Sequence, residues 1–282
     1  MSYDLFLKPD SAPLASGQFA SYFVDRPHYT FSNDQAFYNN EDTGVYFFFE
    51  FDADSISFNL NYFRPHFFGL EAAPEVAAFI SAFNLSVQDP QSDGMGDGPF
   101  SIEGFLRGWN SGNQLGYHAI LSQDERPETH VYPTTELERI WRWNLNRSQL
   151  QDTMGDMLFV PKFMFMKGSE TARSAVVWPN ACPIYMPKAD LVFVLRDELS
   201  STPHTGDPRE ITIVEWPEIE PAVRDYPYDT EHGCFRLEYD MAPSTLSEFV
   251  QSLPMVTNDS NLGLANDSVL NAELVAESMK AG

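Results

Sequence analysis

Two neighbouring apolar segments constrain the fold most strongly. Val45–Phe51 is a nearly continuous apolar run, which predicts a strand covered on both faces. In Ile56–Tyr62 the apolar residues alternate with serine and asparagine, which is the period of a half-buried strand. Because only Asp52-Ala53-Asp54-Ser55 separates the two segments, we predict an antiparallel hairpin.

Further strands and helices are predicted along the whole chain. The strands are expected at Tyr3–Lys8, Met157–Met166, Ser174–Trp178, Leu191–Leu195 and Ile211–Val214. The helices are expected at Ala15–Val24, 71–83, Thr134–Gln151, Ser244–Leu253 and in the tail Asn266–Lys280.

The helix at 71–83 is expected to hold Pro74 in its first turn, with Glu71 and Glu75 complementing the helix dipole.

This mixture predicts an α+β fold with mixed or antiparallel sheets and segregated helices. We expect two α+β sub-domains, residues 1–130 and residues 131–282, the second ending in an acidic stretch.

The N-terminus has no basic region followed by an apolar run, and no apolar stretch approaches bilayer-spanning length, so a cytoplasmic location is expected. The two cysteines, Cys182 and Cys234, are predicted to be buried free thiols.

Metal and cofactor sites are not predicted. Asp89, Asp93 and Asp97 recur every fourth residue in the glycine-rich segment Asp89–Pro99, whereas calcium loops place ligands at every second residue, so a solvated turn is expected. None of the six histidines has metal-site spacing. His28 and His66, each in an Arg-Pro-His sequence, could mark a pair of phosphate-facing groups, but partly buried structural histidines are preferred.

No nucleophile elbow, phosphate-binding loop or dinucleotide fingerprint occurs, so we predict that the protein is not an enzyme and uses no cofactor. Phe63–Phe68 and Met157–Met166 could line a ligand pocket, but core packing on predicted strands or at their ends is the preferred interpretation. The same holds for the tryptophans at 109, 141, 143 and 178.

The charge points to a protein partner. With 17 Lys+Arg against 41 Asp+Glu, the net charge is −24, which disfavours nucleic acid and anionic membranes as partners. From Asp197 onward there are 17 acidic and four basic residues. We predict that acidic and aromatic residues in this stretch bind a basic protein, although a solvated face is an equal alternative. These residues are Glu210, Glu215, Trp216, Glu218, Glu220, Asp225, Tyr226, Tyr228, Asp229 and Glu231.

The chain also resembles a known group of bacterial proteins. The resemblance rests on Tyr3–Leu7, on Tyr22-Phe23-x-x-Arg26-x-x-Tyr29 and on Phe37–Phe47, with weaker support from Trp178–Asp190. These segments are similar to immunity proteins encoded beside type VI secretion or Rhs-type polymorphic toxins, among them those that neutralise restriction-endonuclease-like nucleases.

The resemblance implies a cognate toxin as partner and inhibition by occlusion, with no catalytic residues of the chain's own. One alternative mechanism is open: the protein could bind away from the toxin's active site. Two alternative functions are also open. The protein could be a small-molecule enzyme or sensor with a phenylalanine-rich pocket, or an adaptor or chaperone that loads an effector for secretion.

Overall fold

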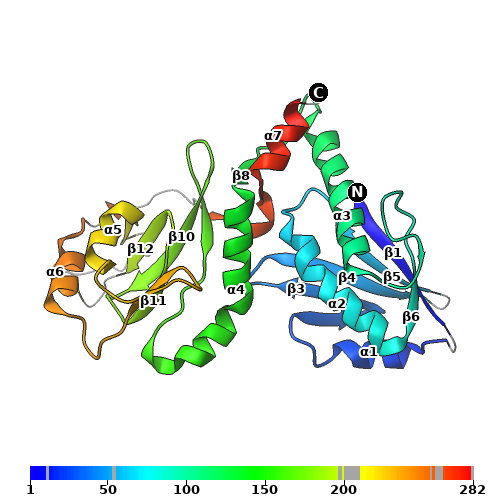
Figure 1. The fold of residues 1–282 in the computed structure, drawn as a ribbon, viewed down its shortest axis with the longest axis horizontal. Coiled ribbons are helices and arrows are strands. Elements are labelled where there is room, and N and C mark those ends of the chain that lie inside the picture. The colour runs from blue at the N-terminus through cyan, green and yellow to red at the C-terminus, as the bar shows by residue number, and fades with distance from the viewer. Residues whose placement is uncertain are drawn as a thin grey trace. The chain divides into compact units, whose positions relative to one another are not determined.

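The chain divides into two compact units (Figure 1). A computed structural model describes residues 1–10, 13–52, 55–195, 199, 210–254, 256–257 and 263–280. The first unit comprises Met1–Glu138 together with Ala265–Gly282, and the second comprises Arg139–Leu264. The predicted boundary at residue 130 lies slightly before this division. The prediction also assigned the last residues to the second sub-domain, whereas they return to the first unit.

The first unit is built on a seven-stranded sheet in the order β2-β3-β4-β5-β1-β6-β7. Its strands are β1 (Ser2–Pro9), β2 (Tyr29–Ser32), β3 (Gln35–Asn40), β4 (Val45–Asp52), β5 (Ser55–Asn61), β6 (Leu85–Gln88) and β7 (Asp97–Gly98). All neighbouring pairs are antiparallel. The α+β class and the predicted β4–β5 hairpin are confirmed.

The prediction that β4 is covered on both faces is wrong. Val45, Phe47 and Phe49 are buried, whereas Tyr46 and Phe48 between them are only half-buried. The strand alternates because helices pack on the inner face of the sheet, and the aromatic side chains of the outer face keep partial contact with solvent.

The helices of the first unit are α1 (Ser16–Phe23), α2 (Phe67–Phe83), α3 (Ile102–Leu121) and α7 (Ala272–Lys280), and α4 (Thr134–Met154) begins there. In Figure 1, α2 and α3 cross in front of the sheet. Phe19 and Phe23 of α1 contact Phe79 of α2 at ring-centroid distances of 5.8 and 5.3 Å, and Phe49 of the sheet lies 4.9 Å from Phe79. This aromatic cluster forms the centre of the core.

Helix α2 begins earlier than predicted, at Phe67, so Pro74 lies inside the helix and not in its first turn. Glu71 is therefore not a solvent-facing helix-dipole partner. Its side chain is buried, and its Oε1 accepts hydrogen bonds from Tyr38 (2.8 Å), Asn40 (2.8 Å) and Thr43 (3.0 Å).

No helix was predicted at Ile102–Leu121, because α3 carries glycine at every fourth position: residues 104, 108, 112 and 116. The spacing places these glycines on one face of the helix. A β-carbon at Gly112 would lie 2.1 Å from Tyr62 Oη, and one at Gly108 would lie 2.9 Å from the Gly94 backbone. The glycines therefore permit the close approach of α3 to its neighbours.

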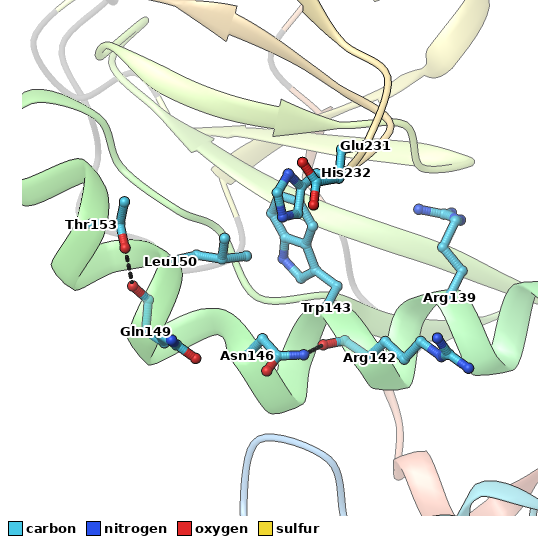
Figure 2. Close-up of a pocket in the computed structure, with 9 residues that line it drawn as sticks. All are labelled: Arg139, Arg142, Trp143, Asn146, Gln149, Leu150, Thr153, Glu231 and His232. Carbon is cyan, nitrogen blue, oxygen red and sulfur yellow. Dashed lines mark hydrogen bonds between the residues drawn. The ribbon is translucent and has the colours of Figure 1, made fainter.

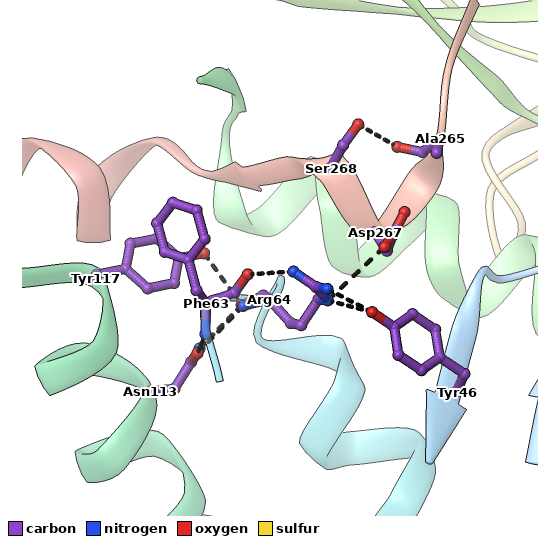
Figure 3. Close-up of polar contacts among 8 residues, drawn as sticks. All are labelled: Tyr46, Phe63, Arg64, Asn113, Tyr117, Ala265, Asp267 and Ser268. Carbon is purple, nitrogen blue, oxygen red and sulfur yellow. Dashed lines mark hydrogen bonds and ion pairs between the residues drawn. The ribbon is translucent and has the colours of Figure 1, made fainter. Parts of the chain in front are cut away.

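A turn at Phe63 links the sheet to α2 (Figure 3). Phe63 has a φ of 61°, and Asn113 Oδ1 of α3 accepts hydrogen bonds from the backbone N–H of Phe63 (2.7 Å) and Arg64 (3.2 Å). The Arg64 guanidinium donates to Tyr46 Oη and lies 3.7 Å from Asp267. Phe63–Phe68 is thus a turn and a helix start at the end of the predicted strand, and Phe67 and Phe68 are buried as predicted.

The C-terminal segment completes the first unit. Strand β18 (Val269–Asn271) pairs in parallel with β8 (His130–Tyr132), and α7 packs against α3. Leu270 and Val275 of this segment share a core cluster with Tyr117 and Leu121 of α3.

The second unit contains a six-stranded sheet in the order β16-β13-β12-β10-β9-β17 and a three-stranded sheet in the order β11-β15-β14. The first sheet consists of β9 (Met164–Lys167), β10 (Ala172–Pro179), β12 (Leu191–Leu195), β13 (Glu210–Glu215), β16 (Val256–Thr257) and β17 (Gly263–Leu264). The second consists of β11 (Ile184–Pro187), β14 (Tyr228–Asp229) and β15 (Cys234–Leu237). Strands β10 and β12 are parallel.

Helix α4 enters this unit, which also contains α5 (Trp216–Val223) and α6 (Ser244–Ser252). The predicted strand Met157–Met166 is confirmed only at its end, because Gly155–Met157 forms a 3-10 turn and β9 starts at Met164. The predicted strands at β10, β12 and β13 and the helices α4 and α6 are confirmed.

The predicted core tryptophans are buried: Trp109 and Trp178 are fully enclosed, and Trp141 and Trp143 nearly so. Cys234 is a buried free thiol as predicted, whereas Cys182 is free but only partly buried. Among the helices of the described residues, none combines the length and apolar composition needed to cross a bilayer.

Candidate functional site

The predicted partner-binding residues all lie in the second unit. They lie on β13, α5, β14 and the turns that follow these elements. Glu210 begins β13, but its side chain lies outside the described part of the structure. The other nine fall into three groups: carboxylates paired within the unit, aromatic residues and exposed carboxylates.

Three of the carboxylates pair with cationic or titratable side chains of the same unit. Glu215 lies 2.8 Å from Arg173, and Glu220 lies 3.2 Å from Lys188. Asp229 lies 3.1 Å from His232. The ion pairs with Arg173 and Lys188 reduce the charge that the predicted surface can offer to a partner.

The aromatic residues are less accessible than predicted. Trp216 is 9% exposed and stacks on Phe235 at 6.1 Å, because it begins α5 and turns its indole into the unit. The prediction of Trp216 as a surface anchor is therefore corrected. Tyr226 is half-buried beside Tyr239, which leaves Tyr228, 45% exposed, as the accessible ring of the set.

Exposed carboxylates remain at Glu218, Asp225 and Glu231. Asp225 lies 4.0 Å from Arg224. Glu218, Asp225, Glu231 and Tyr228 are thus the exposed members of the predicted set.

A groove lies beside this surface, between α4 and the turn from β14 to β15 (Figure 2). Its volume is about 550 Å³. Helix α4 supplies Arg139, Arg142, Trp143, Asn146, Gln149, Leu150 and Thr153, and the turn supplies Glu231 and His232. The groove was not predicted, because its two walls are almost 80 residues apart in the sequence.

A polar cluster supports the turn side of the groove. The Tyr185 hydroxyl donates to Asp229, and His232 Nδ1 lies 3.1 Å from both the Tyr185 hydroxyl and Asp229 Oδ2. Trp143 stacks on the Tyr185 ring at 5.7 Å. The cluster therefore joins α4, β11 and the turn before β15.

The hydrogen bonds of the cluster hold the turn from β14 to β15. The Tyr185 hydrogen bond, with further bonds from the turn, lowers the pKa of Asp229 to about 2, so this carboxylate stays ionised. Burial and then Asp229 raise the pKa of Tyr185. Burial also raises the pKa of the neighbouring Cys234 to about 12, and a thiol of that pKa is inert as a nucleophile.

The glycine-rich segment Asp89–Pro99 was predicted to be a solvated turn, and this prediction is wrong for its first residue, Asp89. Asp89 is 5% exposed, and its Oδ2 accepts hydrogen bonds from Tyr3 Oη (2.7 Å) and the Met95 N–H (2.8 Å). Asp93 and Asp97 are exposed. Within the described ranges, no group of three or more His, Cys, Asp or Glu side chains could hold a metal ion.

The two predicted structural histidines differ. His66 is partly buried and contacts Glu138 (3.4 Å) and Asn271 (2.7 Å). His28 is exposed, because it lies in the turn before β2 with a φ of 67°. The prediction of partial burial is correct for His66 and wrong for His28.

Assigning the charges to the two units changes the electrostatic interpretation. The first unit carries 23 acidic and six basic residues, a net charge of −17. The second carries 18 acidic and 11 basic residues, a net charge of −7. The larger surplus therefore lies in the first unit, which the sequence analysis did not identify because it counted only the stretch from Asp197 onward.

Several cations of the first unit are held in structural contacts. Arg26 pairs with Glu75 at 3.1 Å and Arg64 with Asp267 at 3.7 Å. Arg107 donates to the backbone oxygens of Asp93 (3.0 Å) and Gly94 (2.8 Å). The surplus carboxylates of this unit therefore set the potential of its surface.

Neither a family model, nor a curated protein, nor a solved structure matches the chain.

Proposed function

We propose that this protein binds and neutralises a cationic protein, as a cytoplasmic immunity protein against an antibacterial toxin of the type VI secretion or polymorphic-toxin kind. The observation that carries the proposal is the net charge of −17 on the first unit, whose six cations are outnumbered by 23 carboxylates. A nuclease is the partner that fits this charge best, because it must present a basic surface to its phosphodiester substrate.

The mechanism follows from electrostatics. A negative surface of this size steers a basic protein into encounter and raises the association rate. Once bound, the acidic unit occupies the surface that nucleic acid would use, and substrate is excluded without any reaction by the immunity protein itself.

The product of the adjacent reading frame provides the test. Co-expression with this protein should restore growth to cells that express that product, and calorimetry should give a Kd on the order of nanomolar or tighter. The association rate should fall by about tenfold or more between low and high salt, because added ions screen the charges. Export of the product without restored growth would favour the adaptor alternative, and micromolar binding insensitive to salt would contradict the electrostatic mechanism.

A further inference from the structure

The seven-stranded sheet of the first unit has two unlike faces. Its inner face is buried against the helices, as the pattern of Tyr3, Leu5 and Leu7 on β1 shows. The intervening side chains point to the outer face. On the four long strands β3, β4, β5 and β1 these outer residues are Gln35, Phe37, Asn39, Tyr46, Phe48, Glu50, Ser57, Asn59, Asp4, Phe6 and Lys8.

The outer face exposes aromatic rings. All 23 phenylalanines lie in the described part of the chain, where Phe6, Phe37 and Phe159 are the exposed ones, and two of these three lie on this face. Phe37 is the cross-strand partner of Phe48 and stacks on Tyr46 at 6.5 Å. Exposed rings on a regular sheet are typical of the anchors that a partner protein buries.

Polar groups surround these rings. Asp4 Oδ1 accepts a hydrogen bond from Asn59 Nδ2 (2.5 Å), and Glu50 Oε1 accepts one from Gln35 Nε2 (3.2 Å). Both donors are neutral amides, so neither hydrogen bond cancels the charge of its carboxylate. Lys8 is the cation among the outer residues listed above, so Asp4 and Glu50 leave them a net charge of −1, and the face combines apolar anchors with a slight excess of negative charge.

The extent of the face suits a protein partner. With strands about 4.8 Å apart and about 3.4 Å per residue, the four long strands cover roughly 450 Å². That is more than half of the roughly 800 Å² that each partner contributes to a stable interface. Edge residues of β2 and β6 extend the same surface.

We propose that the outer face of this sheet is the docking surface for a cationic protein, with Phe37 and Phe6 as its apolar anchors. This inference rests on the proposed function and names the surface that carries it. Charge selects the occupant: the surrounding unit carries −17, so a second copy of the chain would be repelled, whereas a basic protein with apolar recesses is complementary.

The test measures binding of the purified product of the adjacent reading frame to matched variants of the two units. On the sheet face the variants are Phe37→Ser and Glu50→Lys, and in the second unit they are Tyr228→Ser and Glu218→Lys. Each pair removes one exposed ring and reverses one exposed carboxylate. Phe37→Ser should weaken binding by about 30-fold or more, and Glu50→Lys should slow association several-fold in a salt-dependent way. The second-unit variants should change the Kd by less than about threefold.

Each outcome bears on one proposal. Failure of the unmodified protein to bind would overturn the proposed function and this inference together. Two results would overturn this inference and leave the proposed function standing. One is binding that is lost only in Tyr228→Ser and Glu218→Lys. The other is unchanged affinity in both Phe37→Ser and Glu50→Lys. A dimer of the chain alone that dissociates in Phe37→Ser would identify a second copy as the occupant and also overturn it. Circular dichroism and Phe37→Tyr, which retains a ring, control for folding.

Discussion

The two units use their carboxylates differently. In the second unit, Glu215, Glu220 and Asp229 each have a cationic or titratable partner nearby, and the net charge is −7. In the first unit the net charge is −17, and cations such as Arg26 and Arg64 hold local structure. A local run of acidic residues in the sequence is therefore a poor guide to the charge that a surface offers.

The difference extends to the buried polar groups. The first unit buries Glu71 beneath three donors from β3 and the turn after it. The second unit places its polar cluster, Tyr185, Asp229 and His232, at the edge of a groove. We expect the first unit to be more sensitive to loss of a polar group, because its donors would have no access to water.

The largest effect is expected from Glu71→Leu. The change leaves the side-chain donors of Tyr38, Asn40 and Thr43 without their shared acceptor, and it should lower the free energy of unfolding by about 3–5 kcal/mol. Urea unfolding followed by circular dichroism measures this. The control is Glu75→Gln, at a side chain that is 27% exposed, with an expected loss of about 1 kcal/mol. Equal losses in the two variants would contradict the role given to Glu71.

Gly108→Ala should have the next largest effect. An added methyl group would lie 2.8 Å from Tyr3 Oη and 2.9 Å from Gly94 Cα, so backbone must move. We expect a loss of about 1–3 kcal/mol despite the better helix propensity of alanine. Gly17→Ala in α1 is the matched control, because its β-carbon meets nothing within 4 Å, and it should be neutral or slightly stabilising. Thermal unfolding of both variants gives the comparison, and a stable Gly108→Ala would show that α3 is not closely packed.

The same glycines explain where sequence reasoning succeeded and failed. Segments with a clear period, such as β5 and α4, were predicted with nearly correct bounds. Helix α3 was missed because glycine at every fourth residue is typical of loops, and only the neighbouring Tyr62 and Tyr3 show why it is needed. The parallel pairing of β18 with β8 joins residues about 140 positions apart, and no local pattern records such a contact.

The pairing of the predicted partner-binding residues also depends on contacts that are distant in the sequence. The identity of the acidic residues is readable from the sequence, but their partners are not: Arg173 and Lys188 reach Glu215 and Glu220 from distant elements. The outer face of the first sheet was also hidden, because the continuous run of β4 favoured a strand buried on both sides.

The two units should lose stability in different pH ranges. Burial lowers the pKa of His66 in the first unit, although Glu138 and Asn271 oppose the shift. The folded unit therefore binds protons less readily than the unfolded chain, so its stability falls as the pH drops below about 6.5. Asp229 in the second unit has a pKa lowered from 3.8 to about 2, so its contribution is complete above pH 3.8 and is lost as the pH falls toward 2.

Hydrogen exchange with mass spectrometry, corrected for the intrinsic rate at each pH, resolves peptides from the two units. His66→Gln should remove the change near neutral pH from the first unit only, and Asp229→Asn should affect only the acidic range of the second. If both units lost protection together at the same pH, the separation of the two titrations would be wrong.

The smallest effect concerns the internal pairing of the second unit. Glu215→Gln removes the partner of Arg173, at a side chain that is 57% exposed, and should cost about 0.5 kcal/mol at low salt and less at high salt. Glu231→Gln, at an exposed carboxylate on the edge of the groove, should stay within about 0.3 kcal/mol of the unmodified protein at any salt. The difference between the two variants in the free energy of unfolding, measured with urea at two salt concentrations, tests whether ion pairs of the second unit's carboxylates stabilise that unit. If salt changed neither variant, its ion pairs would contribute nothing measurable, and its surface charge would be as available to a partner as that of the first unit.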